Sequence, residues 1–226
     1  MTAAPTLDIE RSLFATGASV VIGCDEVGRG AIAGVVAVGA CAIIASVDAP
    51  PARLRDSKLL SPARRAEVEP LVHEWAVACA VGEAQPDEID ARGIIVALGL
   101  AARRALIALH EVGVDVARST VLLDGSHDWL TPALTSPPRI LTRVKADRDC
   151  ASVAGASVVA KQHRDALMVA DHERWPAYGW NGNKGYGSAA HLAAVAEFGA
   201  SPRHRLTWLR EPALLDAVEV APGMTV

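Results

Sequence analysis

The feature that most limits the possible folds is an acidic, glycine-rich interruption inside the most apolar part of the chain. Residues 19–44 read SVVIGCDEVGRGAIAGVVAVGACAII, with Asp25, Glu26 and a Gly-Arg-Gly turn inside them. The flanking segments are rich in Val and Ile, which is typical of buried strands. The link VGRG is short enough for an antiparallel hairpin. We therefore predict adjacent strands over residues 19–26 and 31–44, with carboxylates where the first one ends.

The composition of this 226-residue chain fits a single domain with a sizeable core, because 51% of its residues are hydrophobic. The apolar run 31–44 has 14 residues, which is too short to cross a bilayer. Charged residues at positions 8, 10 and 11 precede any long apolar run, so we expect no signal peptide and no membrane partner. The four cysteines are widely spaced and contain no CxxC pair. Reduced thiols in a cytoplasmic protein are the expectation.

The charge distribution is uneven along the chain. The net charge is -4, yet residues 139–210 hold 11 Lys and Arg against 6 Asp and Glu. Such a region is typical of a nucleic-acid contact, although on charge alone ordinary surface charge is the favoured explanation. Arginine outnumbers lysine 18 to 4, so a lysine suggests a position that needs a compact ammonium. The four are Lys58, Lys145, Lys161 and Lys184.

Periodicity and turn residues predict a mixed α/β order for the rest of the chain. A helix should start at Ser61 and Pro62 and should kink or stop at Pro70. Gly113 should end a second, longer helix. The other predicted elements are strands over residues 75–84, 119–125 and 139–147 and helices over residues 86–112, 150–175 and in the segment 181–205. The resulting fold class is a mixed five-stranded sheet flanked by helices.

The predicted strands place carboxylates at three strand ends: Asp25 with Glu26, Asp124, and Asp147. Side chains alternate along a strand, so Asp25 and Glu26 can share one centre only where the strand bends, as the following glycines would allow. Buried carboxylates need a cation or an Arg or Lys partner. Oxygen ligands suit Mg²⁺ or Mn²⁺, and two such ions among four carboxylates can hydrolyse a phosphodiester. Each acid could instead be a turn residue, since Asp before Gly is a common turn signal.

Six motifs in order resemble those of ribonuclease HII, the type 2 ribonucleases H. The likeness runs from about residue 18 to residue 210. It departs from the family pattern at Ala31, Ala146 and Gly93, where Pro, Gly and Asn are common. The motifs are CDEVGRG (24–30), DSKLLS (56–61), LLDGS (122–126), VKADRDCASVAGASVVAKQHRD (144–165), NKGYGSAAH (183–191) and SPRHRLTW (201–208).

The resemblance implies a ribonuclease H-like fold over residues 18–210, with a C-terminal helical extension from about residue 165. An N-terminal segment (1–17) precedes it, and a tail (211–226) follows that we expect to be poorly ordered. The implied activity is cleavage of RNA in RNA–DNA hybrids and on the 5′ side of single ribonucleotides in duplex DNA. The products would carry 3′-hydroxyl and 5′-phosphate ends, and the enzyme would act as a monomer.

The resemblance also implies roles for particular residues. The catalytic, metal-binding carboxylates would be Asp25, Glu26, Asp124 and Asp147. A loop that contacts the ribonucleotide 2′-hydroxyl would be Gly28-Arg29-Gly30, because glycine lets the backbone approach a sugar closely. Tyr186, in a loop made flexible by glycine on both sides, would pack on the neighbouring deoxyribose. The remaining substrate-binding candidates are Ser57 and Lys58, the latter as a phosphate contact.

Three other functions stay open on sequence alone. One is a nucleic-acid-binding protein that kept the fold without turnover, and another is an interaction domain whose acids are turn residues. A third is a type 1 ribonuclease H, which the Gly-Arg-Gly loop disfavours. A nucleophilic triad is not expected, because the chain has no GxSxG elbow. We expect His127, His163, His191 and His204 on the surface or beside phosphate, and not as metal ligands.

Overall fold

A mixed sheet of five strands organises residues 4–209, the part of the chain that this computed structural model describes. The strand order is β3-β2-β1-β4-β5, with β1 at the centre. β2 is antiparallel to both β1 and β3, whereas β1, β4 and β5 run parallel. The strands are β1 (Val20–Val27), β2 (Val36–Ile43), β3 (Ala78–Ala84), β4 (Ser119–Asp124) and β5 (Arg139–Arg143). The predicted sheet and its antiparallel first pair are confirmed.

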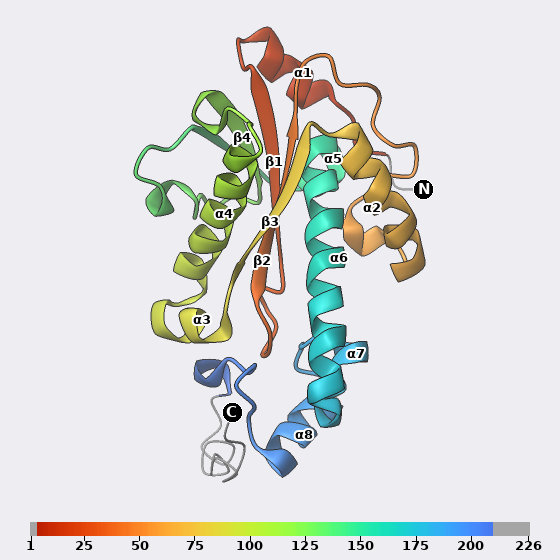
Figure 1. Ribbon diagram of the computed structural model, residues 1–226, viewed down its shortest axis with the longest axis vertical. Coiled ribbons are helices and arrows are strands. Elements are labelled where there is room, and N and C mark those ends of the chain that lie inside the picture. Colours follow the sequence, from red (N-terminus) through yellow and green to blue (C-terminus); the bar gives the residue numbers. More distant parts are fainter. Residues whose placement is uncertain (1–3, 210–226) are drawn as a thin grey trace.

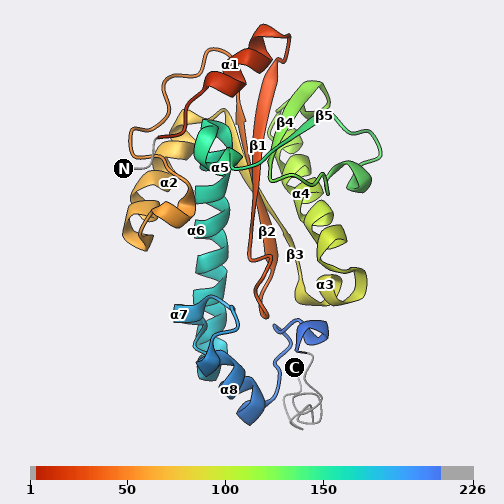
Figure 2. The same cartoon turned by 180° about the vertical axis from the view of Figure 1, so that it is seen from behind.

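Helices cover both faces of the sheet, with α4 on one side and α6 on the other (Figure 1). Seen from behind, α7 and α8 lie beyond the end of the sheet at which β1 leads into β2, beside the end of α6 (Figure 2). The helices are α1 (Asp8–Ala15), α2 (Pro62–Trp75), α3 (Pro86–Arg92), α4 (Ile94–Glu111), α5 (Ala146–Asp149), α6 (Ala151–Arg174), α7 (Trp180–Asn183) and α8 (Ala189–Phe198).

Small residues let α6 lie directly on the central strands. A Cβ on Gly23 of β1 would stand 2.2 Å from the carbonyl carbon of Ser152. One on Gly39 of β2 would stand 2.2 Å from the carbonyl oxygen of Ala156. Because side chains alternate along a strand, Asp25 faces α6 as Gly23 does. This close approach brings α6 to the acidic end of β1.

The N-terminal segment packs on the same side of the sheet. Leu7 and Leu13 are buried in the core cluster that contains α6. The buried carboxylate of Glu10 accepts hydrogen bonds from the Ser152 backbone N–H at 2.9 Å and from its hydroxyl at 2.8 Å. α1 therefore satisfies a donor at the start of α6. The predicted tail, residues 211–226, lies outside the described residues.

The link between β1 and β2 is longer than the sequence indicated. β1 extends to Val27 and β2 begins only at Val36, so the predicted start of the second strand at residue 31 is wrong. The intervening backbone bonds to the C-terminal extension instead of to a strand: Ile32 N–H donates to Gly185 and Gly34 N–H donates to Arg203. The hairpin is antiparallel, but its connection spans residues 28–35.

Two helix boundaries also differ from the prediction. α2 continues through Pro70 to Trp75, so β3 starts at Ala78 and not at residue 75. Val68 and Val72, one on each side of the proline, are fully buried, and this packing holds the helix together. The predicted helix over residues 86–112 is two helices, because Gly93 takes φ 78° between α3 and α4.

Two further features concern residues 4–209. All four cysteines are free thiols. No helix in this part of the chain combines the length and apolar character that crossing a bilayer requires.

Candidate active site

Two of the predicted carboxylates lie on neighbouring parallel strands. Cys24 of β1 pairs with Leu123 of β4, so Asp25 and Asp124 follow side by side in the sheet. Asp124 is the last residue of β4, as predicted. Glu26 also lies in the regular ladder, opposite Val38 of β2. The bend expected directly after the acids therefore comes only at Gly28. The charge of Asp124 nevertheless raises the pKa of both Asp25 and Glu26, so both side chains lie near the same third acid.

Asp147 reaches the site from a helix and not from a strand end, which corrects the prediction. β5 ends at Arg143, and Lys145 then takes a left-handed conformation with φ 62°. This turn starts the short helix α5, in which Asp147 is the second residue. The Asp147 backbone N–H donates to Oδ1 of Asp124 at 3.3 Å. The fourth acid is thus fixed against the third by a backbone contact.

Burial and mutual repulsion disfavour the charged form of these acids. Asp25 is 3% exposed, and its pKa is raised to about 8, mainly by burial. The charges of Glu26 and Asp124 add to this rise, while a hydrogen bond from Ser157 and the charge of Lys58 oppose it. The excess negative charge is what a bound cation would neutralise.

The pKa values of Glu26 and Asp124 are raised as well. Burial is the main cause for both groups. The charge of Asp124 adds to the rise at Glu26, which Arg29 opposes, and the charge of Asp147 adds to the rise at Asp124. The four acids therefore act on one another as a connected group, although they come from three separate segments.

Two cationic side chains balance part of this charge. Arg29 lies 3.5 Å from a carboxylate oxygen of Glu26, and the Nζ of Lys58 lies 3.3 Å from Oδ2 of Asp147. Burial lowers the pKa of Lys58, but the charges of Asp25, Asp56 and Asp147 outweigh it and raise that pKa overall. Lys58 is thus drawn toward the acids and keeps a mostly exposed side chain.

The donor chemistry of this group fits a hard divalent cation. All four groups are carboxylates, which are the ligands that Mg²⁺ and Mn²⁺ prefer. Zinc sites usually contain sulfur or imidazole ligands, and none of the four groups is of that kind. As the side chains stand, no three His, Cys, Asp or Glu within residues 4–209 are arranged to hold a metal ion. Glu26 and Asp147 are engaged with Arg29 and Lys58, so a cation would have to displace these pairs.

The predicted Gly-Arg-Gly loop follows the acids directly. Gly28 is buried with φ 80°, a conformation that favours glycine, whereas Arg29 and Gly30 are exposed. The Tyr186 ring is 41% exposed, and the guanidinium carbon of Arg164 lies 5.7 Å from its centroid. The loop before Tyr186 is pinned, because the Gly185 carbonyl accepts from both Ile32 and Ala33. The tyrosine loop therefore contacts the same link between β1 and β2 that contains Gly28, Arg29 and Gly30.

Ser57 and the other lysines have more varied positions. Ser57 is 4% exposed, and its hydroxyl lies 2.8 Å from that of Ser157, the residue that bonds Asp25. Ser57 is therefore buried and supports Asp25 indirectly, through Ser157. Lys161 forms an ion pair within α6, with its Nζ 2.6 Å from Oδ1 of Asp165. Lys145 and Lys184 have positive φ and lie beside Asp147 and Tyr186 along the chain.

The sequence did not predict that two arginines and two histidines near the site are buried. Arg164 and Arg205 are fully buried beneath the Gly28–Val35 link. His191 and His204 are also buried, with their Nε2 atoms 3.0 Å apart, so the expected surface position is wrong for both. His127 is exposed, as expected. For the two arginines and the two buried histidines, the only sequence signal was their place in the motifs AKQHRD, GYGSAAH and SPRHR. A motif of this kind does not specify that a residue is buried.

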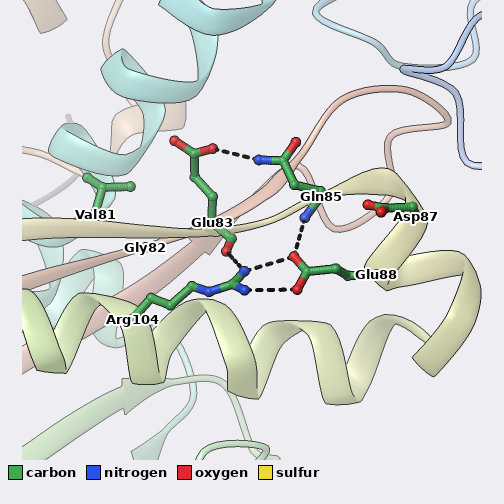
Figure 3. A pocket seen from close by; sticks show the side chains of 7 residues that line it. All are labelled: Val81, Gly82, Glu83, Gln85, Asp87, Glu88 and Arg104. Atoms are coloured by element: carbon green, nitrogen blue, oxygen red, sulfur yellow. Dashed lines mark hydrogen bonds and ion pairs between the residues drawn. The ribbon is translucent and has the colours of Figure 1, made fainter.

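A separate pocket of about 590 Å³ lies between β3, α3 and α4 (Figure 3). Its one arginine is paired: Arg104 binds Glu88 through both terminal nitrogens and also donates to the Glu83 carbonyl. None of the predicted site residues lines this pocket. The acidic end of β1 and β4, and not this pocket, is the candidate active site.

The fold and the carboxylate set together define a nuclease of the ribonuclease H-like class. The model of the family "Ribonuclease HII" matches residues 22–211. Ribonuclease HII of Streptomyces griseus is 46% identical over 218 residues, which cover 95% of this chain and 86% of that protein. The chain therefore belongs to the ribonuclease HII family, whose members are metal-dependent endonucleases that act on nucleic acids.

Solved structures agree with the fold. Ribonuclease H2 from Pyrococcus horikoshii OT3 superposes with a TM-score of 0.65 and 21% identity, covering 88% of this chain and 96% of that one. Bst-RNase HIII in complex with Mn²⁺ gives a TM-score of 0.68 and 20% identity, covering 90% and 71%. At these identities the likeness concerns the fold alone. It confirms the predicted ribonuclease H-like α/β architecture.

Proposed function

We propose that the chain cleaves the RNA strand of RNA–DNA hybrids and cuts on the 5′ side of single ribonucleotides embedded in duplex DNA. The observation that carries this proposal is the adjacency of two elements on one strand. The acids Asp25 and Glu26 lie in β1, and the loop with Gly28 and the exposed Arg29 and Gly30 follows within two residues. The loop proposed to recognise the ribose thus directly follows, in the same segment, the carboxylates proposed to catalyse phosphodiester hydrolysis.

The 2′-hydroxyl is the atom group that separates RNA from DNA, and it both donates and accepts hydrogen bonds. The Gly28–Gly30 backbone can approach it closely, because two of its three residues lack a Cβ. Tyr186, exposed and joined to the same loop through Gly185, would pack on the deoxyribose of the next nucleotide. Together these contacts would select a ribonucleotide followed by DNA.

The ions we propose are Mg²⁺ or Mn²⁺, held by Asp25, Glu26, Asp124 and Asp147. When bound, two such ions activate a water and stabilise the leaving oxygen of the phosphodiester. The products would carry 3′-hydroxyl and 5′-phosphate ends. Lys58 lies at the rim of the acids with most of its side chain exposed, so it can turn to a substrate phosphate when a cation replaces it. Arg29 is similarly exposed beside Glu26.

We further propose that the protein acts as a monomer in the cytoplasm. The four free thiols support a reducing compartment.

The test is incubation with a DNA duplex that carries one ribonucleotide, with Mg²⁺, with Mn²⁺ and with EDTA. We expect one nick on the 5′ side of the ribonucleotide with either ion and none with EDTA. An all-DNA duplex of the same sequence is the control for specificity, and a long RNA–DNA hybrid tests the second substrate. Cleavage of the hybrid alone would instead support a type 1 activity. Binding without any nicking would support a binding protein.

A further inference from the structure

The link between β1 and β2 is held from beneath by two buried arginines that have no carboxylate partner. Arg164 of α6 and Arg205 of the C-terminal segment are both 0% exposed. Buried arginines normally pair with acids, because an uncompensated charge is costly to remove from water. Within residues 4–209, neither of these two forms an ion pair. Their partners are backbone carbonyls.

Arg205 binds the Gly-Arg-Gly segment directly. Its Nη2 donates to the Gly28 carbonyl at 2.7 Å, and its Nη1 donates to the Arg29 carbonyl at 3.0 Å. Its Nε and Nη2 both donate to the Gly34 carbonyl, at 3.2 and 3.1 Å. One guanidinium therefore fixes both ends of the link, from a position 171–177 residues away in the sequence.

Arg164 completes the support and extends it to the tyrosine loop. It donates to the carbonyls of Val35 at 2.8 Å and Ala33 at 3.0 Å. Its remaining bond, 2.9 Å long, goes to the carbonyl of Lys184, two residues before Tyr186. The space beneath the link is filled, since a Cβ on Gly28 would stand 2.0 Å from Nε of Arg164.

This arrangement sets the direction of the peptide groups above it. In a trans peptide the C=O and the following N–H point opposite ways. Because the carbonyls of Gly28 and Arg29 point inward to Arg205, the N–H groups of Arg29 and Gly30 point away from it. Neither N–H bonds any other group within the described residues. A carbonyl bound to a charged donor also strengthens the N–H of its own peptide as a donor.

We infer that Arg205, assisted by Arg164, is a positioning residue for ribonucleotide selection: it orients the Gly28–Gly30 backbone so that the Arg29 and Gly30 N–H groups face the substrate. This inference rests on the proposed function of that loop. Arg205 touches no substrate itself. The planar guanidinium is the necessary feature, because its several N–H donors let a single side chain bind three carbonyls at different positions.

Burial and the neighbouring Arg164 charge lower the pKa of Arg205 to about 9. The side chain thus still carries its charge at neutral pH. Without that charge the Gly28 and Arg29 carbonyls would lose their strong donors, and the link would be free to rotate its peptide groups.

The decisive variant is Arg205→Gln, with Arg203→Gln as the matched control. Arg203 lies two residues away in the same basic segment, but its side chain binds Asp171 and Gln85 and not the link. The primary readout is the ratio of Kd values for an all-DNA duplex and for the same duplex with one ribonucleotide, measured in EDTA so that no cleavage occurs. We expect Arg205→Gln to reduce the wild-type ratio at least tenfold and Arg203→Gln to leave it within about twofold.

Amide hydrogen exchange of residues 29–35 and kcat/KM at a single ribonucleotide complete the test. Arg205→Gln should speed exchange in the link and lower kcat/KM, while affinity for all-DNA duplex stays near wild type. Should Arg205→Gln fail to fold, Arg205→Lys replaces it, because it keeps the charge but loses the planar guanidinium. A folded variant with faster exchange and an unchanged Kd ratio would overturn the inference, as would Arg205→Lys with the wild-type ratio. If the wild type itself shows neither a Kd preference nor cleavage, the proposed function fails instead.

Discussion

Two clusters of like charge lie near the Gly28–Val35 link, and their charges are balanced in different ways. The acids Asp25, Glu26, Asp124 and Asp147 carry like charges, and the pKa values of Asp25, Glu26 and Asp124 are raised. Two exposed cations, Arg29 and Lys58, lie at their edge. The arginines 164 and 205 also repel one another, but they are saturated by backbone carbonyls.

A charged cluster that needs an external partner therefore differs from one that the protein balances by itself. The Arg29 and Lys58 pairs balance only part of the acidic charge, so an incoming cation would complete the proposed site. The arginines need nothing further, so their role is to hold the polypeptide. Breaking the first cluster should therefore cost activity and spare the fold, whereas breaking the second should cost both.

The largest effect is expected for Asp124→Asn. The amide keeps the size of the side chain and can still accept from the Asp147 N–H, but it loses the charge that holds the ion. A metal ion is worth several kcal/mol in such a transition state, so kcat/KM at a single ribonucleotide should fall at least about a hundredfold. The melting temperature without metal should stay equal or rise, because one repulsive charge is removed. Near wild-type cleavage in saturating Mg²⁺ would contradict the ligand assignment.

Gly28→Ala tests the arginine side of the comparison, with Gly30→Ala as its control. At Gly28 a methyl group meets Arg164 and a positive φ of 80°, whereas nothing lies within 4 Å of a Cβ on Gly30. Strain and overpacking should lower the free energy of unfolding by about 2–4 kcal/mol for Gly28→Ala, and cleavage should fall too. Gly30→Ala should be close to neutral in denaturant unfolding. Equal losses for both variants would show that the contact with Arg164 is unimportant.

A pH series tests the histidine pair beside the tyrosine loop. His204 is 2% exposed; its Nδ1 accepts from Ser201 N–H, while the Nδ1 of His191 lies 2.9 Å from the Tyr186 carbonyl. Burial lowers the pKa of His204 to about 4, and the neighbouring His191 adds to this shift. The folded state thus favours neutral His204, so stability is full above about pH 6.5 and is lost as pH falls toward 4.

The loss should be on the order of 2 kcal/mol between pH 7 and pH 4.5. Glu10 and Asp25, whose pKa values are raised, titrate in the same window with the opposite sign. The measurement is therefore the difference in unfolding free energy between wild type and His204→Asn at both pH values, with the exposed His127→Asn as control. A difference that does not change with pH would show that His204 is not held neutral.

Tyr186 should give the smallest of these effects, confined to substrate choice. Its ring is exposed, so Tyr186→Ala should hardly change the melting temperature. Packing of an aromatic ring on a nucleotide is worth roughly 1–3 kcal/mol. We expect the ratio of cleavage rates on a single-ribonucleotide duplex and on a long hybrid to fall about tenfold, and Tyr186→Phe to be milder. If both substrates slow equally, the tyrosine only supports the site in general.

Much of the fold could be predicted, because strands and helices carry their own periodicity. The strand β4 ending at Asp124, the helix cap at Ser61 and the long helix α6 all lie where the patterns placed them. The errors fall where a backbone contact with a distant segment overrides local preference. The link 28–35 bonds to residues 185 and 203 and not to a strand, and Asp147 follows a turn at Lys145 that no pattern in β5 announces.

The class of chemistry could be read from the sequence alone: it shows four carboxylates in a fixed order, a Gly-Arg-Gly loop beside the first two, and the motifs of the family. The packing of the chain was needed to show that Arg205 binds the Gly28 carbonyl, that His191 contacts His204, and that Ser57 supports Asp25 through Ser157. Residue type and spacing report only the local propensity and burial along one segment. A hydrogen bond between residues 28 and 205 depends on how several packed elements meet, and it leaves no periodic sign in either segment.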